Sequence, residues 1–292
     1  MKPIYIPKDI YWSELSFNPG AVHYLEQNMD KVDWNGLSCN PAAIHLLEQN
    51  QDKINWHQLS TNSAAIQLLE QNPDKIDWGI LSANPAAIHL LEQNPDKINW
   101  SRLSANPAAI HLLEQNPDKI NWYWLSANPA AIHLLEQNQD KINWDWLSEN
   151  PAAIKLLDQN PDRINYIYFS QNPAAYDILE NNPHLIDGYH IQYNPNPKIV
   201  SRLVKYNKDS DMFGLCLNPY AIRFLEENID KICFLSLCEN PNALHLLFPL
   251  DHKKMKEENA PFAEELCAKV FEPARMIRLA KDVPLWEYME AY

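Results

Sequence analysis

Apolar positions recur along this chain every 22 residues, and within each copy they have the spacing of an α-helix. In one copy the apolar residues that share a helix face are Ala109, Ile110, Leu112 and Leu113. Their spacing of i, i+1, i+3 and i+4 is typical of a helix buried on one side. The pattern therefore predicts one amphipathic helix per copy. A helix this short is marginal alone, so neighbouring copies must cover it.

Each copy also carries the residues that start and stop a helix. Asn106 can accept a backbone N–H of the first turn through its side-chain oxygen, and Pro107 fits the first helical position, where no N–H is needed. The helix is expected to run to Gln115 and to stop at Asn116, which a further proline follows. A second, very short helix is predicted over 122–125, which leaves only short connections within a copy.

The copies follow one another over most of the chain. Residues 81–100 and 103–122 are identical, which chance cannot produce. The asparagine that begins each copy marks eleven anchors, the first eight spaced by 22 residues and the last three following one step of 24. These anchors are Asn18, Asn40, Asn62, Asn84, Asn106, Asn128, Asn150, Asn172, Asn196, Asn218 and Asn240. Units of this size bury their apolar faces only by stacking on their neighbours.

The predicted fold is an all-α solenoid of about eleven 22-residue repeats, each with one α-helix and one short helix or 3₁₀ turn. A column of large aromatic residues is expected in its core, because each such side chain can bury about 150–250 Å². The column consists of Trp12, Trp34, Trp56, Trp78, Trp100, Trp122 and Trp144, continued by Tyr166 and Phe234. With helices about 8–10 Å apart, the repeats would form an elongated body on the order of 90 Å, straight or superhelical.

The repeat pattern divides the chain into three expected segments. They are an N-terminal cap at 1–11, the repeat solenoid at 12–248 and a helical C-terminal cap at 249–292. Caps are expected because the outer face of a terminal repeat has no neighbour to cover it. The solenoid is regular over 12–187 and divergent over 188–248. Gly188 stands where a Trp is expected, and two extra residues follow, so a change in stacking is expected there.

Charge and cysteine usage narrow the classes of partner and compartment. The net charge is −14 and the sequence contains no basic stripe, so neither nucleic acid nor an anionic membrane surface is expected as a partner. The five cysteines form no CxxC pair, and the N-terminus lacks the apolar segment of a signal peptide. These features predict an intracellular protein with free thiols that is not secreted.

No group of residues in the sequence points to catalysis, a cofactor or a metal. The sequence contains no Gly-rich phosphate loop, HExxH or GxSxG motif. One column of the helix carries histidines, namely His23, His45, His89, His111 and His133. Successive repeats would hold these side chains about 8–10 Å apart at the backbone, too far for a shared ion unless they lean together. A solvated helix face is the favoured interpretation, and a pH-responsive stripe is the alternative.

The repeated carboxylates and the cysteines have structural explanations that involve no catalysis. Glutamates and aspartates repeat at regular exposed positions, whereas catalytic carboxylates are few, buried and differently tuned. Cys216 and Cys238 occupy a column that holds serine in other copies, and Cys233 lies nearby in the sequence. We interpret these cysteines as small buried residues, with a cysteine-based site as the alternative.

The repeat motif LSxNPxAIxLLExNPDKIxW resembles repeats that large DNA viruses of amoebae, the mimivirus-like and marseillevirus-like groups, encode in many copies. The resemblance covers about 12–248 and is nearly verbatim over 34–165. It implies a viral protein that acts in the host cytoplasm or is packed in the virion. It brings no catalytic residues to this chain.

Two positions in each copy vary while their surroundings do not. They lie between the Trp and the Leu of the short helix, and their variation indicates that they are exposed. In three adjacent copies they hold Tyr123, Trp124, Trp146 and Tyr168, which are the candidate partner-binding residues. Exposed aromatic clusters are typical of protein-binding surfaces. The alternative, that these rings shield the short helix or pack between repeats, stays open.

The sequence thus favours a non-enzymatic scaffold for protein–protein interaction with an unidentified protein partner. Two other functions stay open. One is a structural component that self-assembles into homo-oligomers through the solenoid or its ends. The other is an enzyme with a site near 188–215 or in the C-terminal cap.

Overall fold

The computed structural model describes residues 10–206 and 212–247. Within these ranges every regular element is an α-helix or a 3₁₀ helix, which confirms the predicted all-α solenoid. The longest described helix has ten residues, and none in this part of the chain has the length and apolarity needed to cross a bilayer. The chain divides into two compact units, Met1–Leu247 and Phe248–Tyr292, and only the first contains described residues.

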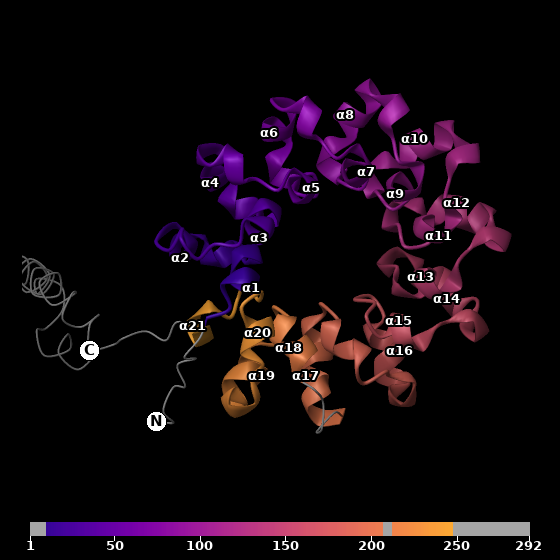
Figure 1. The fold of residues 1–292 in the computed structure, drawn as a ribbon. Coiled ribbons are helices and arrows are strands. Elements are labelled where there is room, and N and C mark those ends of the chain that lie inside the picture. The colour runs from indigo at the N-terminus through magenta and orange to yellow at the C-terminus, as the bar shows by residue number, and fades with distance from the viewer. Residues whose placement is uncertain (1–9, 207–211, 248–292) are drawn as a thin grey trace, which may run out of the picture. The chain divides into compact units, whose positions relative to one another are not determined.

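All of the repeats except the ninth begin with a short α-helix whose first residue is aromatic, and these helices lie along the inner side of the row of repeats (Figure 1). They are α1 (Trp12–Phe17), α3 (Trp34–Cys39), α5 (Trp56–Leu59), α7 (Trp78–Leu81), α9 (Trp100–Ser104), α11 (Trp122–Leu125), α13 (Trp144–Glu149), α15 (Tyr166–Phe169), α18 (Phe213–Leu217) and α20 (Phe234–Leu237). The predicted short helix of residues 122–125 is therefore confirmed. In it the Asn121 side chain caps the first turn by accepting the Trp124 backbone N–H at 3.3 Å.

The second part of each repeat is the predicted amphipathic helix, but it is divided in two. The Asn–Pro step opens a 3₁₀ turn, and the α-helix starts three residues later. In the first seven repeats these turns are η1 (Pro19–Ala21), η2 (Pro41–Ala43), η4 (Ser63–Ala65), η6 (Pro85–Ala87), η8 (Pro107–Ala109), η10 (Pro129–Ala131) and η12 (Pro151–Ala153). Asn106 accepts the Ala108 N–H at 3.0 Å, which confirms its capping role.

The α-helices that follow these turns lie on the outer side of the row (Figure 1). They are α2 (Val22–Glu26), α4 (Ile44–Gln49), α6 (Ile66–Glu70), α8 (Ile88–Gln93), α10 (Ile110–Gln115), α12 (Ile132–Gln137), α14 (Ile154–Asp158), α16 (Tyr176–Asn181), α17 (Pro197–Tyr206), α19 (Ile222–Glu227) and α21 (Leu244–Leu247).

A second 3₁₀ turn leads from most outer helices back to the next repeat. These turns are η3 (Gln51–Lys53), η5 (Pro73–Lys75), η7 (Pro95–Lys97), η9 (Pro117–Lys119), η11 (Gln139–Lys141), η13 (Pro161–Arg163), η14 (Pro183–Leu185) and η16 (Ile229–Lys231). In the ninth repeat a further 3₁₀ helix, η15 (His190–Tyr193), replaces the short inner helix.

The core of the solenoid is built from leucine and alanine columns and from a buried ladder of asparagines. Leu103, Ala109 and Leu113 are completely buried, and so is Asn106. The Asn106 amide donates to the carbonyl oxygens of Ser82 and Asn84 in the preceding repeat, both at 3.1 Å. One side chain thus caps its own helix and satisfies two buried carbonyls of its neighbour, which explains why asparagine is retained at the anchor.

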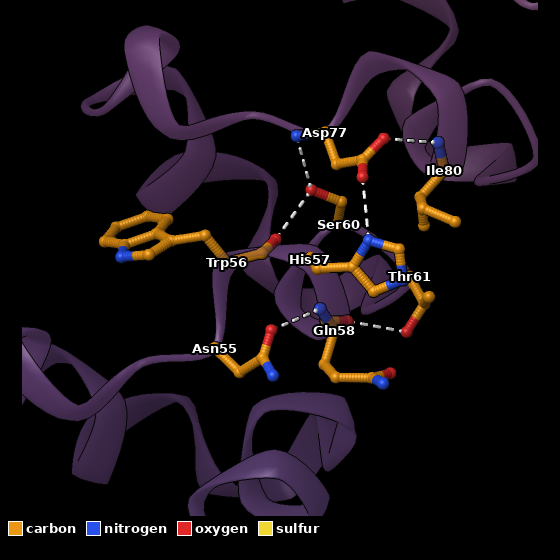
Figure 2. A network of polar contacts seen from close by, with 8 residues as sticks. All are labelled: Asn55, Trp56, His57, Gln58, Ser60, Thr61, Asp77 and Ile80. Carbon is orange, nitrogen blue, oxygen red and sulfur yellow. Dashed lines mark hydrogen bonds and ion pairs between the residues drawn. The ribbon is translucent and has the colours of Figure 1, made fainter.

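A buried serine completes each junction. The Ser60 hydroxyl donates to the Trp56 carbonyl oxygen at 2.9 Å and accepts the Asp77 backbone N–H of the next repeat at 3.1 Å (Figure 2). Asp77 in turn caps its own helix by accepting the Ile80 N–H at 3.0 Å (Figure 2). The same serine column bridges repeats elsewhere, for example from Ser104 to Asn121 at 2.9 Å.

The tryptophans do not form the inner core that the sequence led us to expect. The seven Trp residues of the column are only half-buried. Six of them have the cation of a following lysine or arginine 4.5 to 5.0 Å from the ring centroid. The pairs are Lys31–Trp12, Lys53–Trp34, Lys75–Trp56, Lys97–Trp78, Lys141–Trp122 and Arg163–Trp144. The indoles therefore pack at the margin of the core, where a cation–π contact shields the outer ring face.

The anchor of the ninth repeat is Asn194 and not Asn196. Asn194 is buried and donates to the carbonyl oxygens of Ser170 and Asn172 at 2.8 and 2.9 Å, as an anchor does. Asn196 instead accepts the Lys198 N–H and opens the ten-residue helix α17. The two extra residues thus lie after the anchor, where they lengthen the outer helix, and the ladder continues unbroken to Asn218.

The row of repeats closes on itself. The Asn18 amide of the first repeat donates to the carbonyl oxygens of Cys238 and Asn240 in the last repeat, at 2.8 and 3.0 Å. The other anchors make the same pair of bonds to the preceding repeat, except that Asn84 makes only the one to Ser60. The first inner helix, in indigo, accordingly lies beside the last, in orange (Figure 1). The described residues, 10–206 and 212–247, therefore form a ring of eleven repeats, and the open, elongated body expected from the sequence was wrong.

The ring also changes the expectation for the caps. The face of the first repeat that a cap would cover is occupied by the last repeat through Asn18. The predicted caps at 1–11 and 249–292 lie outside the described residues, apart from Ile10 and Tyr11. They remain predictions from the sequence.

Candidate protein-binding surface

The structure brings the four predicted aromatic residues together on three consecutive inner helices. Tyr123 and Trp124 lie on α11, Trp146 on α13 and Tyr168 on α15. The centroids of Trp124 and Trp146 are 5.6 Å apart, and those of Trp146 and Tyr168 are 5.7 Å apart. Tyr123 packs edge-on against both tryptophans, at 5.3 and 5.7 Å. We call these four residues the aromatic cluster.

Exposure differs within the aromatic cluster. Tyr123 is 47% exposed and Trp124 39%, whereas Trp146 and Tyr168 are half-buried. Trp146 is enclosed because Trp124 and Tyr168 lie on either side of it in the neighbouring repeats. The cluster therefore offers an apolar surface at Tyr123 and Trp124 and also packs between repeats through Trp146. The alternative that these rings pack between repeats thus describes Trp146, and the partner-binding role of the four residues stays a prediction.

A groove with a volume of about 440 Å³ lies beside Trp146. It crosses the sixth to ninth repeats, with prolines from three successive anchors in its lining. Its lining residues are Ala127, Trp146, Glu149, Pro151, Gln171, Pro173, Tyr193 and Pro195, and we call it the proline groove. The prolines follow buried asparagines, so the hydrogen-bonded ladder fixes their positions along the groove.

Glu149 is the only acidic residue in the lining of the proline groove. It is half-buried, and burial raises the pKa of its carboxyl above the usual value, while the nearby His190 partly offsets that rise. In the described part of the chain it forms no hydrogen bond or ion pair through its side chain. The carboxylate thus lines the groove at a desolvation cost that His190 offsets only in part.

Sequence reasoning missed this groove because it considered only two variable positions in each repeat. The position before each anchor asparagine also varies. It holds Phe17, Cys39, Thr61, Ala83, Ala105, Ala127, Glu149, Gln171, Tyr193, Leu217 and Glu239. The change from three alanines to Glu149, Gln171 and Tyr193 was the available signal.

Most histidines of the helix column contact a glutamate of the preceding repeat through an ion pair or a hydrogen bond. Each paired His Nε2 lies 2.6 to 3.0 Å from a Glu carboxylate of the preceding repeat. The pairs are His45–Glu26, His89–Glu70, His111–Glu92, His133–Glu114 and His245–Glu226. Among the residues that the structure describes, no three His, Cys, Asp or Glu side chains are placed to share a metal ion.

The cysteines near the divergent repeats replace serines in the junctions. The Cys233 backbone N–H donates to Cys216 Sγ at 3.3 Å, as the corresponding N–H does to a serine hydroxyl elsewhere. Burial raises the pKa of the Cys238 thiol, an effect that a hydrogen bond from the Tyr11 backbone partly offsets. Thiols of this kind are poor nucleophiles at neutral pH, which fits a structural role.

The region near 188–215 was the sequence-based alternative for an enzyme site. Its described residues include a His190 ring that lies 2.7 Å from Asp187 Oδ1. They also include Gln192, which is buried with its side-chain oxygen unpartnered. Residues 207–211 lie outside the described part of the chain.

Comparison with protein-family models, with characterised proteins and with solved structures gives no significant match.

Proposed function

We propose that this protein is a non-enzymatic scaffold that binds a protein partner through the aromatic cluster. The observation that carries the proposal is the exposure of Tyr123 and Trp124, at 47% and 39%, on a surface that continues through Trp146. Aromatic side chains lose little conformational entropy on binding, and they are enriched at the energetic centres of protein interfaces.

Three further features support a binding role. Trp146 is held between rings from both neighbouring repeats, so the cluster is organised before a partner arrives. Repeat arrays present extended surfaces and leave little buried volume for a reaction centre. The repeat also resembles those of large DNA viruses of amoebae, so we place this activity in the host cytoplasm or the virion.

The experiment compares two sets of variants in a search for binding partners. Tyr123→Ser with Trp124→Ser removes the exposed rings and leaves Trp146 and the junction residues in place. The matched control is Tyr220→Ser with Leu235→Ser, since these exposed side chains lie outside both the aromatic cluster and the proline groove. Affinity capture followed by quantitative mass spectrometry should show a protein lost only with the first pair.

Circular dichroism must show that both double variants keep their helix content. If the folded Tyr123→Ser, Trp124→Ser protein retains every partner, the aromatic cluster is not the binding surface. If that variant unfolds, the rings are needed for packing, and the proposed role of the cluster is wrong.

Self-assembly is a second candidate, favoured by one observation. The bonds from Asn18 to Cys238 and Asn240 close the ring within one chain, and the same groups could join two chains instead. Such an exchange would give a closed dimer or an open filament. Light scattering over a hundredfold range of concentration separates the possibilities. A constant monomer mass would contradict self-assembly, and a mass that rises with concentration would support it.

A further inference from the structure

The proline groove has the form expected of a site for an extended peptide. Its lining comes from four successive repeats, and three of its lining residues are prolines at equivalent positions. Repeats about 8–10 Å apart would span about 25–30 Å over three steps, the length of roughly eight extended residues. The rigid backbone around the prolines gives the groove a fixed shape.

The charge in the groove points to the chemistry of the occupant. Glu149 lies half-buried in the lining with no hydrogen-bond or ion-pair partner among the described residues, and His190 offsets the cost of burying its charge only in part. A partly desolvated carboxylate is costly unless a cation or several hydrogen-bond donors face it. A Lys or Arg side chain supplies both a positive charge and donors, whereas an apolar or acidic side chain supplies neither.

Trp146 provides a second, apolar element of the groove. Elsewhere this chain places its own cations over tryptophan rings, as with Lys97 over Trp78 at 4.5 Å and Arg163 over Trp144 at 5.0 Å. No described lysine or arginine is placed in this way over Trp146, because Trp124 and Tyr168 lie on either side of its ring. Since the ring still lines the groove, it offers apolar surface to the aliphatic stem of a basic side chain whose cation lies at Glu149.

We propose that the proline groove binds an extended segment of the protein partner and receives a Lys or Arg side chain of that segment, with its cation at Glu149 and its aliphatic stem along Trp146. The inference rests on the proposed scaffold function and names the chemical class of the partner. The net charge of −14 favours the approach of a basic segment, and the groove defines where its cation is held.

The test uses defined peptides and the full-length protein. A fluorescein-labelled nine-residue peptide of alanine and serine carries one central lysine, and the matched peptides carry norleucine or glutamate at the same place. Fluorescence polarisation at low ionic strength should show the lysine peptide binding about tenfold more tightly than the norleucine peptide. The glutamate peptide should bind least.

Two charge-matched variants locate the effect. Glu149→Gln keeps the shape of the side chain and should remove the preference for lysine over norleucine. Glu136→Gln removes the same charge from the exposed surface of the outer helix α12 and should leave the preference unchanged. If the wild-type protein binds the lysine and norleucine peptides with equal affinity, the inference is wrong, and no variant is needed to show it.

Two other outcomes would also overturn the inference. One is a lysine preference that survives Glu149→Gln, and the other is a preference lost equally in Glu136→Gln, which would mark general attraction to an acidic protein. The proposed function has a separate readout in the capture experiment with the Tyr123→Ser, Trp124→Ser variant. A partner that depends on the aromatic cluster while the peptides show no lysine preference would contradict only the groove inference.

Discussion

The junction between the fourth and fifth repeats and the seam between the eleventh and the first use the same anchor bonds in different surroundings. We define the seam by Tyr11, Asn18 and Gly20 on one side and Cys238, Asn240, Pro241 and Leu244 on the other. At the interior junction the Asn106 amide bonds measure 3.1 Å, and at the seam those of Asn18 measure 2.8 and 3.0 Å. The asparagine ladder is thus as complete at the seam as elsewhere.

The surrounding contacts differ in three ways. A thiol, Cys238, replaces the serine hydroxyl that bridges the interior junction. The interior junction has the His111–Glu92 contact at 2.8 Å, but the last repeat carries Phe248 in the sequence where Glu92 stands. Burial raises the pKa of the Glu239 carboxyl, and the Glu14 carboxylate across the seam raises it further. The anchor asparagine bonds are thus common to both junctions, whereas the contacts around them are weaker at the seam. We therefore expect the seam to be the junction that opens first.

The largest effect is expected from removing the anchor asparagine at the interior junction or at the seam. Asn106→Ala deletes a helix cap and leaves two buried carbonyls without donors, so the free energy of unfolding should fall by about 3 kcal/mol. Asn18→Ala deletes the same bonds at the seam, where the ring can open and leave the other junctions intact. Helix content should then persist while the hydrodynamic radius increases.

Urea unfolding followed by circular dichroism measures the first variant, and small-angle scattering measures the second. Asn181→Ala is the matched control, because that exposed asparagine makes one bond to the Asp177 carbonyl at 2.8 Å. If Asn18→Ala unfolds the whole chain as Asn106→Ala does, the seam is not a separate point of opening.

An intermediate effect is expected at Gly20. A Cβ added there would lie 3.0 Å from the Pro241 carbonyl oxygen and 3.0 Å from Leu244 Cδ1. Gly20→Ala should therefore weaken the seam by up to about 1 kcal/mol, although alanine at a compatible site usually stabilises a helix. Hydrogen exchange of the α1 amides should become faster in the variant while that of the α9 amides stays the same. Slower exchange in α1 would show that the seam is looser than we describe.

The smallest effect is expected from Glu239. Burial raises the pKa of its carboxyl, and the Glu14 carboxylate raises it further. The folded state then binds a proton more tightly than the unfolded chain, so Glu239 favours unfolding increasingly as the pH rises from 4.5 through the raised pKa. Glu239→Gln should slightly stabilise the protein at neutral pH, and its advantage should shrink as the pH is lowered through that window.

Thermal unfolding at several pH values checks this prediction, with Glu136→Gln as the control for net charge. A Glu239→Gln advantage that is constant from acidic to neutral pH would contradict the assigned cause.

Much of the repeat was predictable because local rules determine it. The Asn106 cap, the stop at Asn116 and the short helix over 122–125 all follow from which residues can end a helix. The leucine and alanine columns likewise follow from helical spacing. The half-buried state of Trp78 was not predictable from spacing, because it depends on where Lys97 of the next turn is placed.

Ring closure was not predictable from any single repeat. A full turn divided among eleven copies is about 33° per repeat, and a small change in that rotation would give an open superhelix instead. The aromatic cluster was recognised because its positions vary against a constant background. The proline groove was missed because Glu149 lies one residue before an anchor, and we treated that column as part of the repeat.

The most direct test of the ring is the distance across the seam. His23 and His245 occupy the same outer-helix position in the first and last repeats, and His89 and His111 occupy it in two adjacent repeats. Spin labels attached through p-acetylphenylalanine at each pair avoid the native thiols, and double electron–electron resonance gives the two distance distributions. We predict that the His23–His245 distribution overlaps that of His89–His111. A separation across the seam tens of ångströms longer than the interior one would show an open solenoid and contradict the ring.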